Sequence, residues 1–413
     1  MEAESSRSHD IVIVGGGAGG IAAAASLLRR RPSLDIAIVE PRESHFYQPG
    51  WTLVGFGIFD PSQTVRPMAD VMPRGATWLK TAAAGFSPET DTVQLADGSS
   101  IRYRLLIVAT GNRLAWELVD GLPETLGKNG VTSNYSYDTA PYTWELVQQV
   151  KEGRALFTQP PMPIKCAGAP QKAMYLSCHA WEKRGVLEHI DVQFHTAGPV
   201  IFGVAAYVPA LMETVERYGI DLHVSSNLIA VDGSARKATF KTADGEVTTK
   251  FSMLHVTPPQ KAVQVVADSA LADEAGYVEV DQETLQHKRY PNVFAIGDAG
   301  GMPNAKTAAA VRKQAPVVAI NALAALGGEA LEAIYDGYGS CPLTVEAGRI
   351  LLAEFCYGGA LQPTFPKWLI DGTRPSRLAW ILKKDLMPPI YWDAMLKGHE
   401  WLAGPRLRKA EAV

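Results

Sequence analysis

Four cysteines are the residues of this 413-residue sequence best suited to redox chemistry, and none of their spacings matches a metal site of the zinc type. Cys166 follows a proline-rich stretch, and Cys341 lies close to a glycine and a proline, which we interpret as a rigid turn. Cys178 lies in an apolar stretch of a predicted helix and Cys356 in a predicted strand, so we expect both to be structural. The pattern by itself leaves a redox role and a structural role open for Cys166 and Cys341.

A glycine-rich turn near the N-terminus has the residue types and spacing that cradle a dinucleotide. A predicted strand over 10–14 leads into the turn, an alanine-rich helix continues to about Arg30, and a second strand over 35–40 ends in an acid. The glycines allow a tight turn, the approach of a pyrophosphate and close helix packing, while the acid can accept hydrogen bonds from a ribose. The predicted cofactor-binding residues here are Gly15, Gly17, Ala18, Gly19, Gly20 and Glu40.

Two later segments indicate which dinucleotide fits this turn. Residues 105–111 are predicted to form a buried strand that ends in Thr-Gly, and residues 290–298 a strand that ends in Gly-Asp. In this order the three segments resemble the flavoproteins with two dinucleotide-binding domains, a family that includes disulfide reductases and membrane NADH dehydrogenases. The resemblance implies FAD as cofactor, with a lysine and the positive end of a helix beginning near 306–307 directed at the flavin. It implies further contacts to FAD from Gln48, Ala83, Thr110, Gly111, Gly297, Asp298, Lys306 and Thr307.

A second nucleotide-binding unit is predicted between these segments, with a strand over 154–158, a helix over 172–184 and a strand over 190–194. Where a nicotinamide-binding unit needs glycines, residues 159–165 contain three prolines and a lysine. The second strand also ends without an acid for a ribose or an arginine for a phosphate. We therefore expect a unit that keeps its shape without a nicotinamide site, so that the flavin receives electrons from another donor.

Several long and unusual strings carry a more specific likeness. They are residues 47–55, 164–177, 255–259, 283–292, 306–310, 340–343 and 385–388. From about Asp10 to the C-terminus the chain resembles the sulfide:quinone oxidoreductases, specifically the type II branch that includes the mitochondrial enzyme, and the strings around Cys166 and Cys341 resemble its redox-cysteine motifs. Because no cysteine precedes Cys166, the covalent flavin attachment of the three-cysteine branch is not available, and FAD is expected to bind non-covalently.

The resemblance implies a sulfur cycle on the two cysteines. Cys166 and Cys341 are linked at rest, as a disulfide or through an added sulfur, and hydrogen sulfide attacks at Cys341 as hydrosulfide. This leaves a persulfide on Cys341 and a thiolate on Cys166, from which an electron pair passes to FAD and on to ubiquinone or menaquinone. A small acceptor such as glutathione or sulfite then takes the sulfur. The thiolate needs a stabilising group, and either a cationic neighbour such as Lys165 or Lys172 or the N-terminus of a helix could lower its pKa. We favour the helix that starts near Ala169, and expect both lysines to occupy solvated surface positions.

The C-terminal stretch 361–413 has the composition of a membrane-contacting surface. It holds nine Lys and Arg against five Asp and Glu, and four of the nine tryptophans. Because quinone is dissolved in lipid, we expect this stretch to dock on a membrane, and a helical pair packed on protein is the alternative. The first apolar run has acids before it and glycines within it, so we expect no signal peptide and a peripheral protein on the cytoplasmic face of a bacterial inner membrane. The residues predicted at the quinone entrance are Phe365, Trp368, Trp380 and Tyr391.

The whole chain is predicted to be an α/β protein, a tandem Rossmann-like flavoprotein with a C-terminal amphipathic helical segment that docks on a membrane. Residues 1–115 and 276–335 are expected to form the FAD-binding domain, 116–275 an inserted NAD(P)H-like domain, and 336–413 the segment with Cys341. The net charge of −4 argues against a nucleic-acid partner, whereas a homo-oligomer is left open. The rival interpretations are a type II NADH:quinone oxidoreductase, the flavin subunit of a sulfide dehydrogenase and a non-catalytic persulfide sensor.

Overall fold

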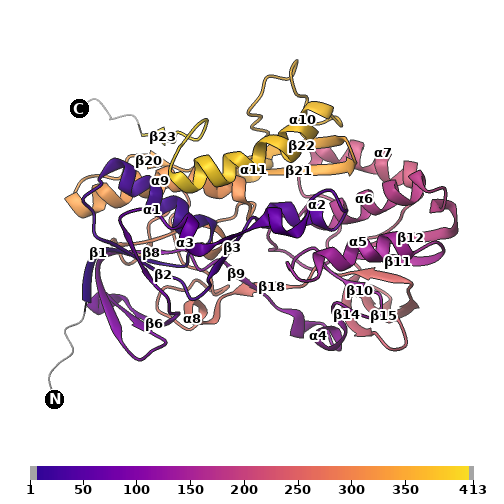
Figure 1. Ribbon diagram of the computed structural model, residues 1–413, viewed down its shortest axis with the longest axis horizontal. Helices are drawn as coiled ribbons and strands as arrows, with labels where there is room; N and C mark the ends of the chain where they lie inside the picture. The colour runs from indigo at the N-terminus through magenta and orange to yellow at the C-terminus, as the bar shows by residue number, and fades with distance from the viewer. Residues whose placement is uncertain (1–6, 409–413) are drawn as a thin grey trace.

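Two parallel β-sheets lie side by side along the long axis of the computed structural model, which describes residues 7–408 (Figure 1). The first sheet, at the left of Figure 1, has the order β5-β2-β1-β8-β7-β6, with β19 beside β8. Its pairs are parallel except for β7, which is antiparallel to both of its neighbours. Its strands are β1 (Arg7–Val14), β2 (Ile36–Val39), β5 (Ala76–Leu79), β6 (Ala83–Ser87), β7 (Thr92–Leu95), β8 (Ser100–Val108) and β19 (Val293–Ala295).

The sequence of this first unit explains its layers. Residues 11–14 of β1 are apolar without alternation and all buried, as expected for a parallel strand that is covered on both faces. Helix α1 (Ala18–Arg30), whose alanines are buried, packs against α9 (Ala308–Gly327). The first turn of α1 requires glycine at position 20, because a Cβ there would lie 1.9 Å from the Gly15 carbonyl oxygen. The strand, helix and strand predicted for this region are confirmed.

The second sheet, at the right of Figure 1, has the order β10-β17-β11-β12-β13 and is parallel throughout. Strands β11 and β12 confirm those predicted over 154–158 and 190–194, and α6 confirms the helix between them, although it begins at Ala169. An antiparallel sheet β14-β15-β16 contacts this unit. The elements of the second unit, including this antiparallel sheet, are β10 (Val131–Thr132), α5 (Ala140–Gln149), β11 (Gly153–Gln159), α6 (Ala169–Lys183), β12 (Ile190–Thr196), α7 (Val208–Tyr218), β13 (Asp221–His223), β14 (Asn227–Asp232), β15 (Lys237–Thr242), β16 (Gly245–Lys250) and β17 (Met253–His255).

Two short strands carry the chain between the sheets. β9 (Asn112–Leu114) leaves the first sheet after β8, β18 (Gln260–Ala262) returns to it after β17, and the two pair antiparallel. The α/β fold with two parallel sheets is therefore confirmed, while the domain bounds given above stay a prediction. The remaining short elements of this part are β3 (Ser44–Phe46), α2 (Trp51–Val54), β4 (Val65–Pro67), α3 (Met68–Val71), α4 (Leu122–Thr125) and α8 (Gln264–Ala267).

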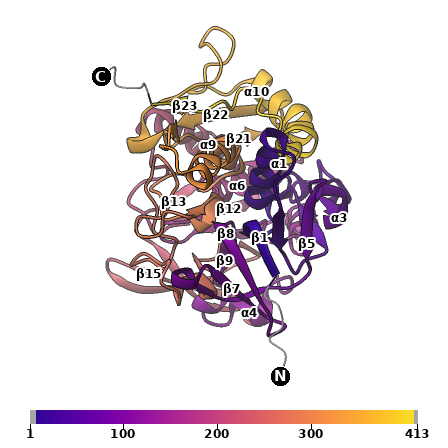
Figure 2. The same cartoon turned by 90° about the vertical axis from the view of Figure 1, so that its left-hand side faces the viewer.

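The C-terminal segment crosses both units. Strands β21 (Gly339–Glu346) and β22 (Arg349–Phe355) form a hairpin, and β21 packs on α6. A helical stretch follows with α10 (Arg377–Ile381) and α11 (Met387–Pro389), and it runs back over the first unit to lie beside α1 (Figure 2). Residues 391 and 392 of this stretch are buried in the core of the first sheet, and β20 (Ala333–Ile334) pairs with β23 (Arg406–Leu407). Between residues 7 and 408 no helix is both long and apolar enough to cross a bilayer.

Cys341 lies within β21, so the turn predicted around it is wrong. Pro342 lacks an N–H, yet a strand accommodates it, because among the described residues β21 pairs with β22 alone and has an open edge. The glycine two residues earlier serves close packing, since a Cβ on Gly339 would lie 2.8 Å from the Ala305 Cβ. Both residues that suggest a turn therefore belong to the strand: the glycine allows close packing, and the proline is tolerated at the open edge.

Candidate active site

Cys166 and Cys341 face each other although 175 residues separate them in the chain, and their sulfur atoms lie 3.5 Å apart. Cys166 lies in the loop between β11 and α6, while Cys341 lies in the strand that packs on α6. Gly168 permits this approach, because a Cβ there would lie 2.5 Å from Cys341 Sγ and 2.3 Å from Leu343 Cδ2. Both thiols are free, and a small movement of the side chains from this separation would close a disulfide.

Hydrogen bonds from both units hold the Cys166 loop. The Cys166 N–H donates to the Lys306 carbonyl at 2.9 Å, and the Tyr135 hydroxyl donates to the Cys166 carbonyl at 3.2 Å. The Ala169 N–H closes the turn by donating to the same Cys166 carbonyl at 2.8 Å. Cys166 has a φ of 50°, a left-handed conformation that is uncommon for a residue other than glycine. The loop that a nicotinamide-binding unit would use for phosphate thus holds a thiol at the junction of the two units.

The prediction that Lys172 lies on the solvated surface is wrong. The side chain is 3% exposed, with Nζ 3.1 Å from Cys166 Sγ and 3.8 Å from Cys341 Sγ. The physical reason is charge pairing, since a buried ammonium needs anionic or hydrogen-bonding partners and the two sulfurs supply them. Burial alone would lower the pKa of Lys172, but attraction to both sulfurs raises it above its ordinary value.

The two thiols differ in acidity. The hydrogen bond between the sulfurs, together with the Lys172 ammonium, holds the pKa of Cys166 well below its ordinary value against the effect of burial. The same hydrogen bond and burial raise the pKa of Cys341 well above its ordinary value. When the pair is reduced, Cys166 is therefore the thiolate and Cys341 the thiol. The helix expected to stabilise this thiolate does begin at Ala169, and its fourth residue also supplies a cation.

Two further lysines lie in this region. Lys165 is half-buried, against the prediction of a solvated position, because its Nζ donates to Gln48 Oε1 at 2.7 Å; burial lowers its pKa to about 8. Lys383, in the C-terminal helical stretch, is 3% exposed and donates to the Pro49 carbonyl at 2.8 Å. Burial, followed by repulsion from Lys172, lowers the pKa of Lys383 to about 7. Sequence patterns do not single out Lys383, because lysines in a basic, tryptophan-rich stretch suggest solvent exposure.

The glycine-rich turn fits the pyrophosphate of a dinucleotide. A Cβ on Gly15 would meet the Ala109 carbonyl oxygen at 2.3 Å, so the end of β8 packs closely against the turn, whereas nothing lies within 4 Å of a Cβ built on Gly17. Gly17 is the N-cap of α1 and offers no side chain, so the first N–H groups of this helix can receive an anion. Glu40 Oε2 accepts a hydrogen bond from the Gly16 N–H at 2.7 Å and braces the turn from the second strand. The residues present therefore fit the phosphates of FAD.

Further predicted FAD contacts meet at the carboxyl ends of β8 and β19. Thr110 Oγ1 is buried without a hydrogen-bond partner in the described part of the chain, and Gly111 has a φ of 70° and open space on its Cβ side. Burial raises the pKa of the Asp298 carboxyl group, which follows β19. A buried hydroxyl that lacks a partner beside open space is the kind of group that a polar ligand satisfies.

Lys306 is engaged differently from the expectation. Its Nζ donates at 2.9 Å to the carbonyls of Asp298 and of the glycine two residues later, so the ammonium braces the loop after β19. Thr307 is the N-cap of α9, and its Oγ1 accepts from the N–H three residues later at 3.1 Å. Gly297 has a φ of 70°, and Ala83 is the first residue of β6. The contact of each with FAD stays a prediction.

The four residues predicted at the quinone entrance do not gather in one place. Phe365 and Trp380 are partly buried in a small cluster on the β21–β22 hairpin. Trp368 is 84% exposed in the segment before α10, which rises above the body in Figure 1. Tyr391 is buried in the first unit, and its hydroxyl lies 2.7 Å from His45 Nε2. A role of these side chains in quinone binding stays a prediction.

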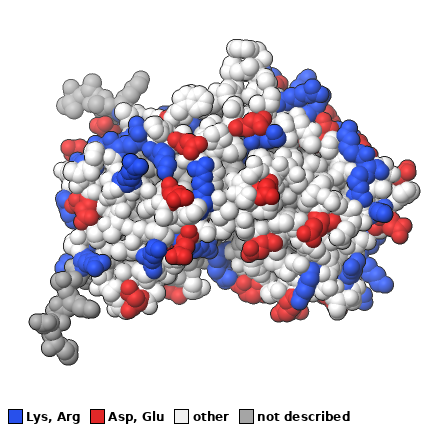
Figure 3. Space-filling model, in the orientation of Figure 1, with Lys and Arg blue, Asp and Glu red and all other residues white. Residues whose placement is uncertain are grey.

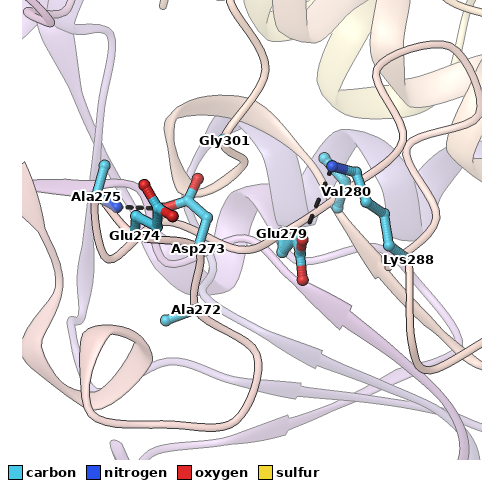
Figure 4. A pocket seen from close by; sticks show the side chains of 8 residues that line it. All are labelled: Ala272, Asp273, Glu274, Ala275, Glu279, Val280, Lys288 and Gly301. Carbon is cyan, nitrogen blue, oxygen red and sulfur yellow. Dashed lines mark hydrogen bonds and ion pairs between the residues drawn. The ribbon is translucent and has the colours of Figure 1, made fainter.

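A surface hollow of about 540 Å³ lies apart from these groups, between residues 272–280 and 288–301 (Figure 4). In its wall the Asp273 carboxylate accepts from the Ala275 N–H at 2.9 Å, and Glu279 lies 3.8 Å from Lys288 Nζ. Its polar groups are thus largely paired with one another. None of the cysteines or predicted FAD contacts lines it, and we assign it no role.

Comparison with known proteins indicates one family. The profile of the pyridine nucleotide-disulphide oxidoreductase family matches residues 9–149. The chain is 43% identical to a protein of Dictyostelium discoideum named as a mitochondrial sulfide:quinone oxidoreductase, over 88% of this chain and 80% of the relative. It is also 43% identical to the protein of the same name in Mus musculus, over 91% and 83% respectively. Among solved structures, the sulfide:quinone oxidoreductase of Aquifex aeolicus has a TM-score of 0.79 at 19% identity, over 96% of this chain and 92% of that chain, which supports the fold.

The same relatives bear on the predicted location. Both sequence relatives carry the word mitochondrial in their names, so they lend no support to a bacterial inner membrane. The helical character of the C-terminal segment is confirmed over 377–397, whereas its docking on a membrane stays a prediction.

Proposed function

The chain belongs to the sulfide:quinone oxidoreductases, and we propose that its buried group of Cys166, Lys172 and Cys341 carries out the sulfur chemistry of that family. The function of the chain is thus the oxidation of hydrogen sulfide with reduction of a quinone. One observation carries the assignment to these residues, namely two sulfurs 3.5 Å apart with an ammonium 3.1 Å from one of them. An acidic thiol beside a less acidic one is the arrangement that favours directed thiol–disulfide exchange.

The direction of sulfur transfer follows from the unequal acidity. Hydrosulfide attacks the Cys341 sulfur of a Cys166–Cys341 disulfide, and the bond between the two cysteine sulfurs breaks. A persulfide forms on Cys341, and the electron pair of the broken bond stays on Cys166 as a thiolate. The thiol of lower pKa is the better leaving group, and Lys172 neutralises the charge that develops on it. Where the resting link contains an added sulfur atom, attack at Cys341 leaves a persulfide there, and the electron pair of the broken bond stays on the added sulfur, which remains attached to Cys166 as a persulfide anion.

We assign the electron acceptor to non-covalently bound FAD, held by the glycine-rich turn, Glu40 and the groups after β8 and β19. FAD, when bound, takes up an electron pair and transfers it to quinone. The residues of the chain hold the thiolate and exclude water. Hydrogen bonds to Lys306 and from Tyr135 fix the Cys166 loop, and Cys341 is 3% exposed.

The C-terminal segment is the proposed membrane contact. Figure 3 shows the tip of the projecting loop before α10 largely free of charged side chains, with Lys and Arg nearby. Indole rings settle at headgroup depth and basic residues meet anionic lipid, so this surface suits a peripheral protein that reaches ubiquinone or menaquinone in the bilayer. The exposed apolar side chains of this surface are Trp368, Leu369, Leu378, Ile381 and Leu386.

A small molecule is the proposed acceptor of the persulfide sulfur. Cys341 is buried between β22 and the first turn of α6, so a protein acceptor would have to displace packed side chains to reach it. Glutathione or sulfite meets this size requirement.

Anaerobic stopped-flow mixing tests the proposal. Sulfide should reduce the flavin of the wild-type enzyme, and NADH should not, because residues 159–168 offer no glycine cradle for a second dinucleotide. Cys166→Ser and Cys341→Ser should each lose reduction by sulfide, whereas Cys356→Ser, half-buried beyond β22, should retain it. Reduction by NADH alone would favour the NADH:quinone rival, and a fully active Cys166→Ser variant would refute the assignment.

A further inference from the structure

Gln260 joins three segments of the active-site region through one side-chain oxygen. Its Oε1 accepts the Lys165 backbone N–H at 2.7 Å and a hydrogen bond from Asn112 Nδ2 at 2.8 Å. Lys165 directly precedes Cys166, and Asn112 directly follows the predicted FAD contact Gly111. Gln260 is itself the first residue of β18, on which the chain returns to the first sheet. The amide therefore lies where the sulfur loop, the end of β8 and the crossover meet.

The orientation of this amide is determined by its neighbours. A backbone N–H can only donate, so the Gln260 atom that faces Lys165 must be the oxygen. The nitrogen, Nε2, points elsewhere and is buried without a hydrogen-bond partner in residues 7–408. The residue as a whole is 7% exposed, so water has little access to it. Buried donors are nearly always paired in native proteins, so we expect this nitrogen to donate to a group that binds from outside the chain.

We propose that Gln260 Nε2 donates a hydrogen bond to an acceptor atom of the isoalloxazine ring of FAD and thereby raises the reduction potential of the flavin. The inference rests on the FAD binding proposed above. Two neighbours support it, because the unpartnered Thr110 hydroxyl lies two residues before Asn112, and the Lys165 side chain reaches Gln48, another predicted FAD contact. Reduction adds electron density to the ring, so a donor stabilises the reduced form more than the oxidised form.

The Cys166 sulfur is the rival partner for this donor. That sulfur already faces Cys341 Sγ at 3.5 Å and Lys172 Nζ at 3.1 Å. The flavin is therefore the acceptor that remains without a protein donor, and the rival becomes an outcome of the test.

Two substitutions distinguish the role of the amide nitrogen as a donor from that of the amide oxygen as an acceptor. Gln260→Glu keeps an oxygen for Lys165 and Asn112 but replaces the donor by a second oxygen. Gln260→Met keeps the approximate shape and removes both functions. Gln264→Glu is the matched control, because it makes the same change four residues later on the exposed side of α8, where the side chain only reaches Asp268.

The variants are purified with FAD, and the potential of the bound flavin is measured by dithionite titration against reference dyes, with no sulfide present. In both Gln260 variants the reduced flavin should bind at least tenfold less tightly relative to the oxidised flavin, a potential lower by about 30 mV for a two-electron couple. The decrease should be larger for Gln260→Glu, whose carboxylate faces a ring that becomes electron-rich. Gln264→Glu should keep the wild-type potential. Where Gln260→Met does not retain FAD, Gln260→Glu alone decides.

Two outcomes would overturn the inference. Wild-type potentials in both Gln260 variants, with a shifted titration of the Cys166 thiolate, would place the donor on sulfur instead. Wild-type potentials with an unchanged thiolate would show that the amide has only a structural role. A wild-type protein that holds FAD but does not react with sulfide would refute the proposed function and leave this measurement valid.

Discussion

Replacing Lys172 by methionine removes the buried positive charge beside the two sulfurs, and sulfide oxidation should become strongly dependent on pH as a result. Methionine keeps the length of the side chain, so packing in the first turn of α6 is largely preserved. At an effective dielectric constant of about 20, opposite charges 3.1 Å apart attract by about 5 kcal/mol. Removal of one partner from a buried ion pair costs about 3–5 kcal/mol, which is a factor of about 10² to several times 10³ in the population of the thiolate.

The sign of the effect follows from the loss of a counter-charge. Without the ammonium the pKa of Cys166 rises, so at neutral pH its sulfur is a poor leaving group and a poor electron donor. Stopped-flow reduction of the flavin by sulfide should therefore fall by about two to three and a half orders of magnitude at pH 7 and recover as the pH is raised. Lys183→Met, the same change at the exposed end of α6, should match the wild type.

A Lys172→Met enzyme with the wild-type rate and pH profile would refute this reasoning. A rate that is lowered equally at every pH would refute it too, because that result assigns Lys172 a role in packing and not in charge stabilisation. Direct titration of the thiolate absorbance in the reduced protein separates the two cases.

Three further predictions concern packing, stability and membrane contact. Gly168→Ala should prevent disulfide closure, because its methyl would lie 2.5 Å from Cys341 Sγ; free-thiol counts after mild oxidation should rise, but not in Gly203→Ala, where the space is open. Burial lowers the pKa of His195 to about 3 from 6.5, so the folded chain keeps it neutral while the unfolded chain binds a proton. The free energy of unfolding should then fall by about 1.4 kcal/mol per pH unit as the pH drops from 6.5 to about 3, and urea unfolding of His195→Gln should lack this contribution. Trp368→Ser should bind anionic vesicles about tenfold less tightly in sedimentation, because an indole that is 84% exposed no longer enters the bilayer; equal binding would contradict the proposed surface.

The first unit is predictable from sequence because its determinants are local. The strand, the glycine turn and the helix are contiguous, and one of the close contacts that require glycine joins atoms only five residues apart. The contact of Gly20 with the Gly15 carbonyl is of this kind. Local periodicity and turn chemistry are therefore sufficient there.

The cysteine pair depends on contacts that no local pattern contains. Cys341 reaches Cys166 because β21 packs on α6. The sequence around Cys341 suggests a turn because glycine and proline in an edge strand cannot be told from glycine and proline in a turn by sequence alone. Only the resemblance to a known family joined the two positions. The burial of Lys172 is a second nonlocal effect, since an ammonium enters the interior only where the distant sulfur pair compensates its charge.

The order in which a ribosome delivers the chain determines when the sulfur centre can form. Cys166 leaves the exit tunnel 175 residues before Cys341, together with the helix that will later receive β21. A nascent chain that has completed both parallel sheets still lacks the second sulfur and the hairpin that encloses it. The reactive centre is therefore assembled only after both sheets have been synthesised, so a chain that stops before β21 cannot carry a buried persulfide.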